Sequence, residues 1–209
     1  MRFILDDPHD VIQECWAKNQ FYEADELAMM AKYIPPDSVI LDVGANVGNH
    51  SIWFDKHVQP KAVYVFEPHP RAIALMLQNS AVNHCHSIRF DHIGVALGRE
   101  RAKCVVTEMQ SHNLGGTRLA VRDDGFIDTL PGDELNLAPQ FIKIDVEGME
   151  LDVLHGLRRT IDQHRPVMYV EVDNRNEAEF MRLMSGWGYE VLFDIGNYPT
   201  CRNYLLRTC

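Results

Sequence analysis

The chain has 209 residues, of which 46% are hydrophobic, so it can bury the core of one ordinary domain and is too apolar for disorder over most of its length. Its formal net charge is -10 and no run of Lys and Arg is visible, which argues against a general nucleic-acid or membrane-surface binder, because phosphate contacts need clustered basic side chains. The cysteines are odd in number and lack C-x-x-C spacing, which argues against a secreted disulfide framework and favours a cytoplasmic setting.

The first predicted element is a helix over residues 10–33, where Val11, Trp16, Phe21 and Leu27 recur at roughly helical intervals. The N-terminal sequence MRFILDDPHD becomes acidic too early for a signal peptide, and no apolar run approaches the roughly 20 residues of a membrane span. The prolines of IPPD end the helix. We predict a single domain over residues 1–209, in which a helical segment (1–36) precedes the core (37–209).

Strand-like and helical segments alternate along the predicted core. The strand-like runs are rich in Val, Ile and Phe, as in strands covered on both faces, and they are Val39–Val43, Ala62–Phe66, Ile88–Ile93, Phe141–Asp145 and Val167–Val172. The helical segments are His50–His57, Arg71–Val82, Glu150–Asp162 and Glu177–Ser185. This alternation predicts a doubly wound α/β sheet with mostly parallel strands.

Two regions depart from the alternation. An insertion over about residues 99–137 has no clear helix, and its short strand candidates KCVVTEM and DGFIDTL flank the polar sequence SHNLGG. A long irregular insertion in a compact domain is usually functional. At the C-terminus, YEVLFDI and NYLLRTC predict a hairpin that adds an antiparallel strand to the sheet.

The sequence VILDVGANVG passes from the first strand into a helix through Gly44 and Gly48. Glycine allows positive φ and close approach of a ligand, and the free N–H groups of the following helix favour an anion. Asn46 stands where the NAD fingerprint G-x-G-x-x-G has its second glycine, so a pyrophosphate fits less well than the smaller carboxylate of S-adenosylmethionine. Asp42 could then meet the amino group of that cofactor, and Glu67, which follows the second strand, its ribose hydroxyls. The alternative is a glycine turn without a ligand.

Three motifs, DVGANVGNHS, VYVFEPHP and FIKIDVEGMELDVLHGL, resemble in their order the FkbM-type S-adenosylmethionine-dependent methyltransferases. The similarity covers roughly residue 23 to the C-terminus. It implies a Rossmann-like, seven-stranded sheet of the class I methyltransferase type, with S-adenosylmethionine as cofactor and S-adenosylhomocysteine as product. It implies methyl transfer, usually to oxygen and often on sugars or other secondary metabolites. The cofactor-binding residues that it implies are Asp42, Gly44, Ala45, Asn46, Gly48, Glu67, Gly94 and Val95.

A sulfonium methyl group is already activated, so the protein must align the acceptor and help to remove its proton. Asp145 and Glu147 follow the fourth strand and are candidates for the base, for binding a substrate hydroxyl or for contacting the cofactor, although Glu147 could instead cap the next helix. In the insertion, His112 is a second candidate base and Asn113 could bind a hydroxyl, unless both lie in a solvent loop. Glu171 could orient the substrate or cap the helix that follows it.

The sequence predicts an O-methyltransferase that acts on a hydroxyl of a sugar, glycan or secondary metabolite by in-line SN2 transfer. An N-methyltransferase of small molecules or peptides and a non-catalytic cofactor-binding module remain alternatives, and an NAD-dependent oxidoreductase is less favoured. No metal is predicted, but Mg²⁺ held by Asp145, Glu147 and Glu171 stays open, since nothing in their spacing demands or forbids it. The expected partner is the acceptor, without nucleic acid or membrane, and a homo-oligomer could complete the acceptor pocket.

Overall fold

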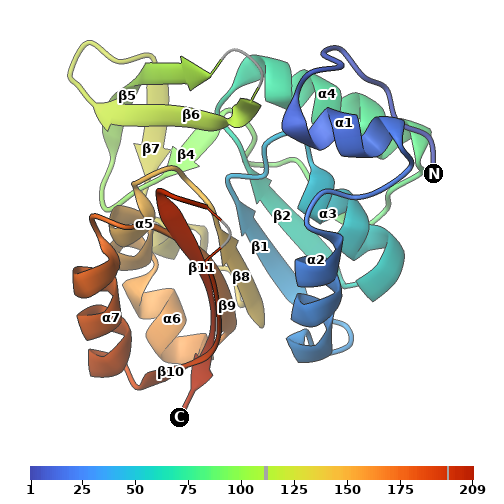
Figure 1. Ribbon diagram of the computed structural model, residues 1–209. Helices are drawn as coiled ribbons and strands as arrows, with labels where there is room; N and C mark the ends of the chain where they lie inside the picture. The colour runs from blue at the N-terminus through green and yellow to red at the C-terminus, as the bar shows by residue number, and fades with distance from the viewer. Residues whose placement is uncertain (111–112, 197) are drawn as a thin grey trace.

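The computed structural model describes residues 1–110, 113–196 and 198–209, and its main element is a seven-stranded sheet of order β10-β11-β9-β8-β1-β2-β3 (Figure 1). Its strands are β1 (Val39–Val43), β2 (Ala62–Phe66), β3 (Ile88–Arg89), β8 (Phe141–Ile144), β9 (Val167–Asp173), β10 (Tyr189–Ile195) and β11 (Cys201–Thr208). Within this sheet, β3, β2, β1, β8 and β9 pair in parallel in that order. Strand β11 is antiparallel to both β9 and β10. The predicted doubly wound sheet with a C-terminal hairpin is confirmed.

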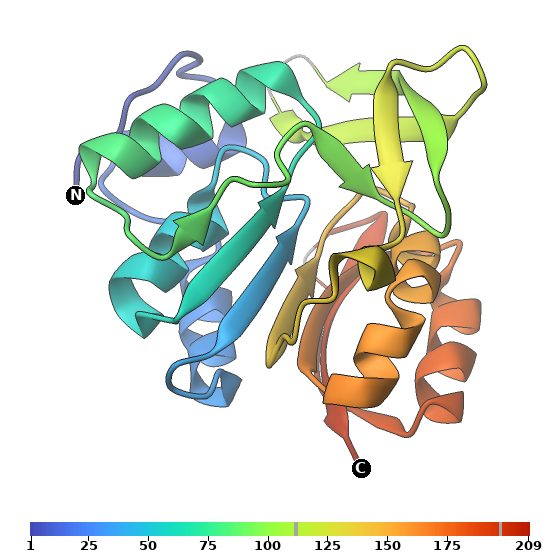
Figure 2. The same cartoon turned by 180° about the vertical axis from the view of Figure 1, so that it is seen from behind.

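Helices cover both faces of this sheet (Figures 1 and 2). They are α1 (Val11–Ala17), α2 (Ala24–Met30), α3 (Asn49–Trp53), α4 (Pro70–Val82), α5 (Glu150–Gly156), α6 (Arg158–His164) and α7 (Glu177–Gly186). Side chains alternate along a strand, so neighbouring residues of β1 pack in the cores on opposite faces of the sheet. Ile40 packs in one core with Leu27 of α2, and Leu41 packs in the other with Val153 of α5. In the described part of the chain, no helix combines the length and apolar character that a membrane span needs.

The insertion and the residues just before it form a second sheet of order β4-β7-β5-β6, which lies beyond the carboxyl ends of β1, β2 and β8 (Figure 1). Its strands are β4 (Val95–Leu97), β5 (Ala102–Gln110), β6 (Asn113–Val121) and β7 (Ile127–Leu130). The sequence analysis did not expect β6, because the glycines of NLGG hide its alternation. Pairing with β5 and a small core of Cys104, Ile127, Val106 and Leu119 stabilise this strand instead.

The single helix predicted over residues 10–33 is wrong. The chain turns between α1 and α2, where Asn19 and Glu23 adopt φ angles of 56° and 55°. Hydrogen bonds to the buried Asn49 hold this turn: Trp16 Nε1 and Tyr22 N donate to Asn49 Oδ1 at 3.0 and 3.1 Å, and Asn49 Nδ2 donates to Tyr22 O at 3.0 Å. Tertiary contacts have overridden the helical spacing of the apolar residues.

The third predicted strand is also shorter than residues 88–93, since β3 ends at Arg89. The chain then turns, and the N–H of Gly94, at φ 86°, donates to the carbonyl of Glu67 at 2.9 Å. This bond brings the start of β4 to the end of β2. The helix predicted over residues 150–162 is divided at Leu157 into α5 and α6.

Candidate active site

The glycine turn after β1 packs closely against the segment that follows β8. A Cβ atom on Gly44, at φ 78°, would lie only 1.7 Å from the carbonyl oxygen of Asp145. The N–H groups of Gly44 and Ala45 both donate to the carbonyl of Phe66, at 2.9 and 3.1 Å, which ties the turn to the end of β2. Glycine is therefore required at position 44 by packing as well as by backbone conformation.

Glu67 is 7% exposed and sits directly behind this turn. Its Oε2 accepts from the N–H of Asn46 at 2.8 Å, and its Oε1 accepts from the N–H of His69 at 2.7 Å. Burial raises the pKa of Glu67 to about 7, although both N–H donors lower it. The carboxylate is thus held in one orientation at the end of β2.

A cavity of about 290 Å³ lies between the carboxyl ends of β1, β2 and β8 and the small sheet. The predicted site residues that line it are Gly44, Asn46, Glu67, Asp145 and Glu147. The small sheet contributes apolar wall residues, among them Val106, Leu119 and the highly exposed Phe126. One cavity therefore brings the glycine turn, the acid after β2 and both acids after β8 together.

The other predicted cofactor residues are not among those that line this cavity. Asp42 is fully buried, accepts from Ser51 Oγ and lies 3.3 Å from Lys143 Nζ. Ala45 is buried, and Gly48 is the N-cap of α3 at φ 89°. Gly94 and Val95 precede the wall residues Ala96 and Leu97.

Of the two candidates in SHNLGG, His112 lies outside the described residues. Asn113 begins β6, close to the glycine turn: a Cβ atom on Gly115 would be 3.1 Å from Asn113 Oδ1 and 2.9 Å from Asn46 Nδ2. The start of β6 therefore lies against the glycine turn after β1.

Asp145, Glu147 and Glu171 form a carboxylate cluster at the ends of β8 and β9, with one oxygen of each within 4.8 Å of the others. Burial, reinforced by the charge of Asp145, raises the pKa of Glu147 to about 7 and also raises that of Glu171. A cation could fit this spacing, but acidic groups often cluster without one, so the geometry assigns no metal.

Lys143 joins the carboxylate cluster to the glycine turn. Its ammonium group is buried, donates to the carbonyl of Gly44 at 2.7 Å and lies 3.3 Å from a carboxylate oxygen of both Asp42 and Asp145. Burial alone would lower the pKa of Lys143, but Asp145 and Asp42 outweigh it and raise that pKa. The lysine therefore stays charged and fixes Asp145 beside the cavity.

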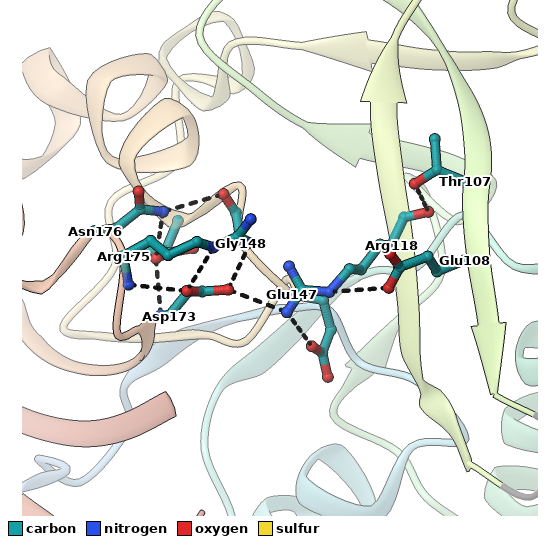
Figure 3. A network of polar contacts seen from close by, with 9 residues as sticks. Thr107, Glu108, Arg118, Glu147, Gly148, Asp173, Arg175 and Asn176 are labelled. Carbon is teal, nitrogen blue, oxygen red and sulfur yellow. Dashed lines mark hydrogen bonds and ion pairs between the residues drawn. The ribbon is translucent and has the colours of Figure 1, made fainter. Parts of the chain in front are cut away.

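Arg118 of β6 is a site residue that the sequence analysis missed. Its Nη2 donates to Asp173 Oδ2 at 3.0 Å and lies 3.8 Å from Glu147 Oε2 (Figure 3). It stands in the insertion, where no motif or local pattern marks a functional arginine. Only the packing of the small sheet on the large one brings it to Glu147.

A second missed group, from segments distant in the sequence, forms around Glu23. Tyr198 donates through its hydroxyl to Glu23 Oε1 at 2.8 Å and also contacts the hydroxyl of Tyr22. His50 Nε2 lies 3.3 Å from Glu23 Oε2. Burial and the charge of Glu23 raise the pKa of Tyr22, and the charges of Asp145 and Glu171 add to this. The group thus joins the segment before α2, the start of α3 and the segment before β11.

The cavity fits a nucleoside with an amino-acid tail. Its apolar wall suits a purine, and Glu67 offers oriented acceptor oxygens for a diol. Asn46 Oδ1 is buried at this wall and has no hydrogen-bond partner among the described residues, so it is available to a ligand. Asn46, Glu67 and the backbone of Gly44 are the groups that would hold such a cofactor.

Known proteins are similar to this chain in sequence. Hexuronic acid methyltransferase AglP of Haloferax volcanii is 25% identical over 158 residues, which are 72% of this chain and 63% of that protein. Methyltransferase 1 of Beauveria bassiana is 26% identical over 150 residues, 59% of each chain. The chain thus spans about three fifths of the length of these curated relatives.

The crystal structure of the methyltransferase FkbM from Methylobacillus flagellatus KT has the same fold, with a TM-score of 0.55 and 20% identity over 87% of this chain and 51% of that one. The model of the methyltransferase FkbM domain matches residues 42–191, well over half of the sequence. The chain therefore belongs to the FkbM methyltransferase family, and its cofactor is S-adenosylmethionine.

Proposed function

We propose that the protein transfers a methyl group to a hydroxyl of a sugar, glycan or other metabolite. One observation carries this proposal: Asp145 and Glu147 line the cofactor cavity and at the same time lie within 4.8 Å of Glu171, which is not among the lining residues. The acidic edge of the cavity is thus where an acceptor would meet the cofactor. When bound, S-adenosylmethionine supplies an activated methyl group on its sulfonium.

Glu147 is our candidate for the general base. Its pKa of about 7, raised by burial and by Asp145, suits a carboxylate that takes a proton from a hydroxyl at neutral pH. Asp145 is held by Lys143 at 3.3 Å and would orient the hydroxyl. As the acceptor oxygen gains the methyl group and the sulfonium–methyl bond breaks to leave a thioether, the proton of that oxygen would pass to a carboxylate oxygen of Glu147.

Tyr22, Tyr198, Glu171 and Asn113 are our candidates for binding the rest of the acceptor. Hydroxyl and carboxylate groups are suited to the many hydroxyls of a sugar. The similarity to a protein named hexuronic acid methyltransferase supports a sugar acceptor.

Transfer to nitrogen is the second candidate. The acids Glu23, Asp145, Glu147 and Glu171 influence one another electrostatically, and such a cluster attracts an amine. An amine must be unprotonated to react, and Glu147 could take its proton in the same way.

A transfer assay with S-adenosylmethionine labelled in its methyl group separates these candidates. The panel pairs a neutral sugar with its uronate and its amino sugar, and NMR identifies the atom that is methylated. We expect Glu147→Gln to lower kcat by about 10²–10⁴-fold. Its affinity for S-adenosylhomocysteine should stay close to wild type.

Asp152→Asn is the matched control, because Asp152 lies on α5 and pairs with Arg99 at the surface. It should retain full activity. If the label is found on nitrogen, the acceptor is an amine and not a hydroxyl. Tight binding of S-adenosylhomocysteine with no transfer to any acceptor would favour a non-catalytic module.

A further inference from the structure

Arg118 lies beside the turn that carries Glu147, at the edge of the cavity that Glu147 lines. Its neighbours in β6, Thr117 and Leu119, both line the cavity. Side chains alternate along a strand, so Arg118 leaves β6 on the other side, toward the β8–α5 turn and the end of β9 (Figure 3). One strand thus contacts the cofactor site through two residues and the candidate base through the residue between them.

The guanidinium group of Arg118 contacts acids from three elements. It donates to Asp173 Oδ2 at 3.0 Å and lies 3.8 Å from Glu147 Oε2 and 3.5 Å from Glu108 Oε2. The side chains of Arg118 and Glu147 are each 23% exposed and that of Asp173 only 8%, whereas Glu108 is 70% exposed. Exposed ion pairs contribute little, so the contacts with Asp173 and Glu147 are the ones that matter.

The turn after β8 needs such a contact. Glu147 adopts φ 52° and Gly148 φ 103°, two consecutive residues in the left-handed region. A non-glycine residue is strained there, so surrounding contacts must hold it. The guanidinium group lies against this turn, because a Cβ atom on Gly148 would be 3.2 Å from Arg118 Nη1.

We propose that Arg118 is a positioning residue that links the small sheet to the turn carrying Glu147, so that cofactor binding against β6 also orders Glu147. Arg118 itself need not touch the cofactor or the acceptor. The catalytic meaning of this link rests on the proposed function, in which Glu147 takes the proton of the acceptor. The link itself is a property of the cofactor complex.

Arg175 provides a matched control, because it binds the same carboxylate from outside the small sheet. Its Nε donates to Asp173 Oδ1 at 2.9 Å and its Nη2 to Asp173 Oδ2 at 2.7 Å. Its side chain is 72% exposed. Arg175→Gln thus removes a partner of Asp173 and leaves the contact between β6 and Glu147 in place.

Hydrogen exchange with and without S-adenosylhomocysteine tests the link in the wild type, Arg118→Gln, Arg118→Lys and Arg175→Gln. In the wild type and in Arg175→Gln, the ligand should slow exchange both in β6 and in the turn over residues 146–149. In Arg118→Gln, β6 should keep this effect, and the slowing in the turn should fall by at least about fivefold, the lower end of typical coupling between sites. Arg118→Lys keeps the charge but not the forked donor. The slowing of exchange in its turn should therefore be intermediate between those of the wild type and Arg118→Gln.

The inference is overturned if the turn responds to the ligand in Arg118→Gln as in the wild type. It is also overturned if Arg175→Gln loses the response equally, or if the wild-type turn does not respond. Should Arg118→Gln fail to fold, Arg118→Lys decides, since a fully wild-type response there removes any need for the guanidinium group. No acceptor is used, so a failure of methyl transfer would contradict the proposed function and leave this result standing.

Discussion

Gly44 and Gly94 both adopt positive φ angles, 78° and 86°, but they differ in their surroundings. A Cβ atom on Gly44 would collide with the carbonyl of Asp145 at 1.7 Å, whereas one on Gly94 would meet nothing within 4 Å. The pair therefore separates two requirements for glycine, backbone conformation and close packing. Only the second concerns the contact between the cofactor turn and the segment after β8.

We predict that Gly94→Ala lowers the free energy of unfolding by about 1–2 kcal/mol, the cost of left-handed backbone for alanine. Gly44→Ala should lose clearly more, because the segment bearing Asp145 must also move, and it should bind S-adenosylhomocysteine weakly or not at all. Urea denaturation and calorimetric titration measure the two effects. Equal losses in both variants would show that the contact with Asp145 is unimportant.

Glu67 should make cofactor affinity depend on pH. Burial raises its pKa to about 7, and a ribose diol that donates to it favours the ionised form. Binding should therefore release a proton below that pH, and affinity for S-adenosylhomocysteine should fall by up to about tenfold per unit as the pH drops below about 7. Above pH 7 the affinity should level off.

Calorimetry in two buffers with different ionisation enthalpies measures this proton release directly. Glu67→Gln is the control, since it should bind weakly and without this pH dependence. The same affinity at about pH 6 and pH 8 in the wild type would exclude a role for Glu67 ionisation.

At the scale of elements, the segment before β1 lies outside the part of the chain that matches the family. That match covers residues 42–191, yet Glu23 of this segment accepts a hydrogen bond from Tyr198, and the charges of Asp145 and Glu171 act on Tyr22. Asn49, which is 2% exposed, fastens the segment to the start of α3 through Trp16 and Tyr22. The position of the segment before α2 therefore depends on the buried side-chain amide of Asn49.

Asn49→Ala should destabilise the protein by about 1–3 kcal/mol per buried group that loses its partner, and it should loosen residues 16–23. Limited proteolysis and urea denaturation test this. Asn83→Ala removes an exposed pair of bonds to the backbone of Arg2 and should have a much smaller effect. Equal protection of residues 16–23 in wild type and Asn49→Ala would mean that other contacts hold the segment.

For the whole molecule, the position of the cavity between the two sheets means that a bound cofactor stabilises the fold. Its walls come from the large sheet and from β5, β6 and β7, so a ligand there contacts both sheets. A ligand that binds only the folded state stabilises it by about 2.7 kcal/mol at a hundredfold excess over Kd. The stability of the protein thus reports directly on which cofactor it binds.

S-adenosylhomocysteine at that excess should raise Tm by several degrees, about 5–10 °C for a chain of this size. NADH at equal concentration should leave Tm unchanged, because Asn46 replaces the glycine that a pyrophosphate needs. Differential scanning calorimetry compares the two ligands. A shift with NADH and none with S-adenosylhomocysteine would reverse the assignment of the cofactor.

Local sequence was sufficient for most of the large sheet, apart from the end of β3. Strands β1 and β2 begin and end where their apolar runs do, and the hairpin of β10 and β11 lies where two strands were expected. It was not sufficient for the turn before α2 or for β6. The turn depends on Asn49, which lies many residues away from it in the sequence. Strand β6 is stabilised by pairing with β5, but the glycines of NLGG hide its alternating pattern.

The sequence by itself determined the mostly parallel doubly wound sheet, the glycine turn and the acids that follow β2 and β8, because these depend on apolar periodicity and on backbone conformations that few residues adopt. Only the tertiary structure decided that Asp42 is fully buried and not among the residues that line the cavity, that Arg118 reaches Glu147, and that Tyr198 donates to Glu23. Those contacts join segments distant in sequence, and their distances depend on how the two sheets and the terminal segments pack.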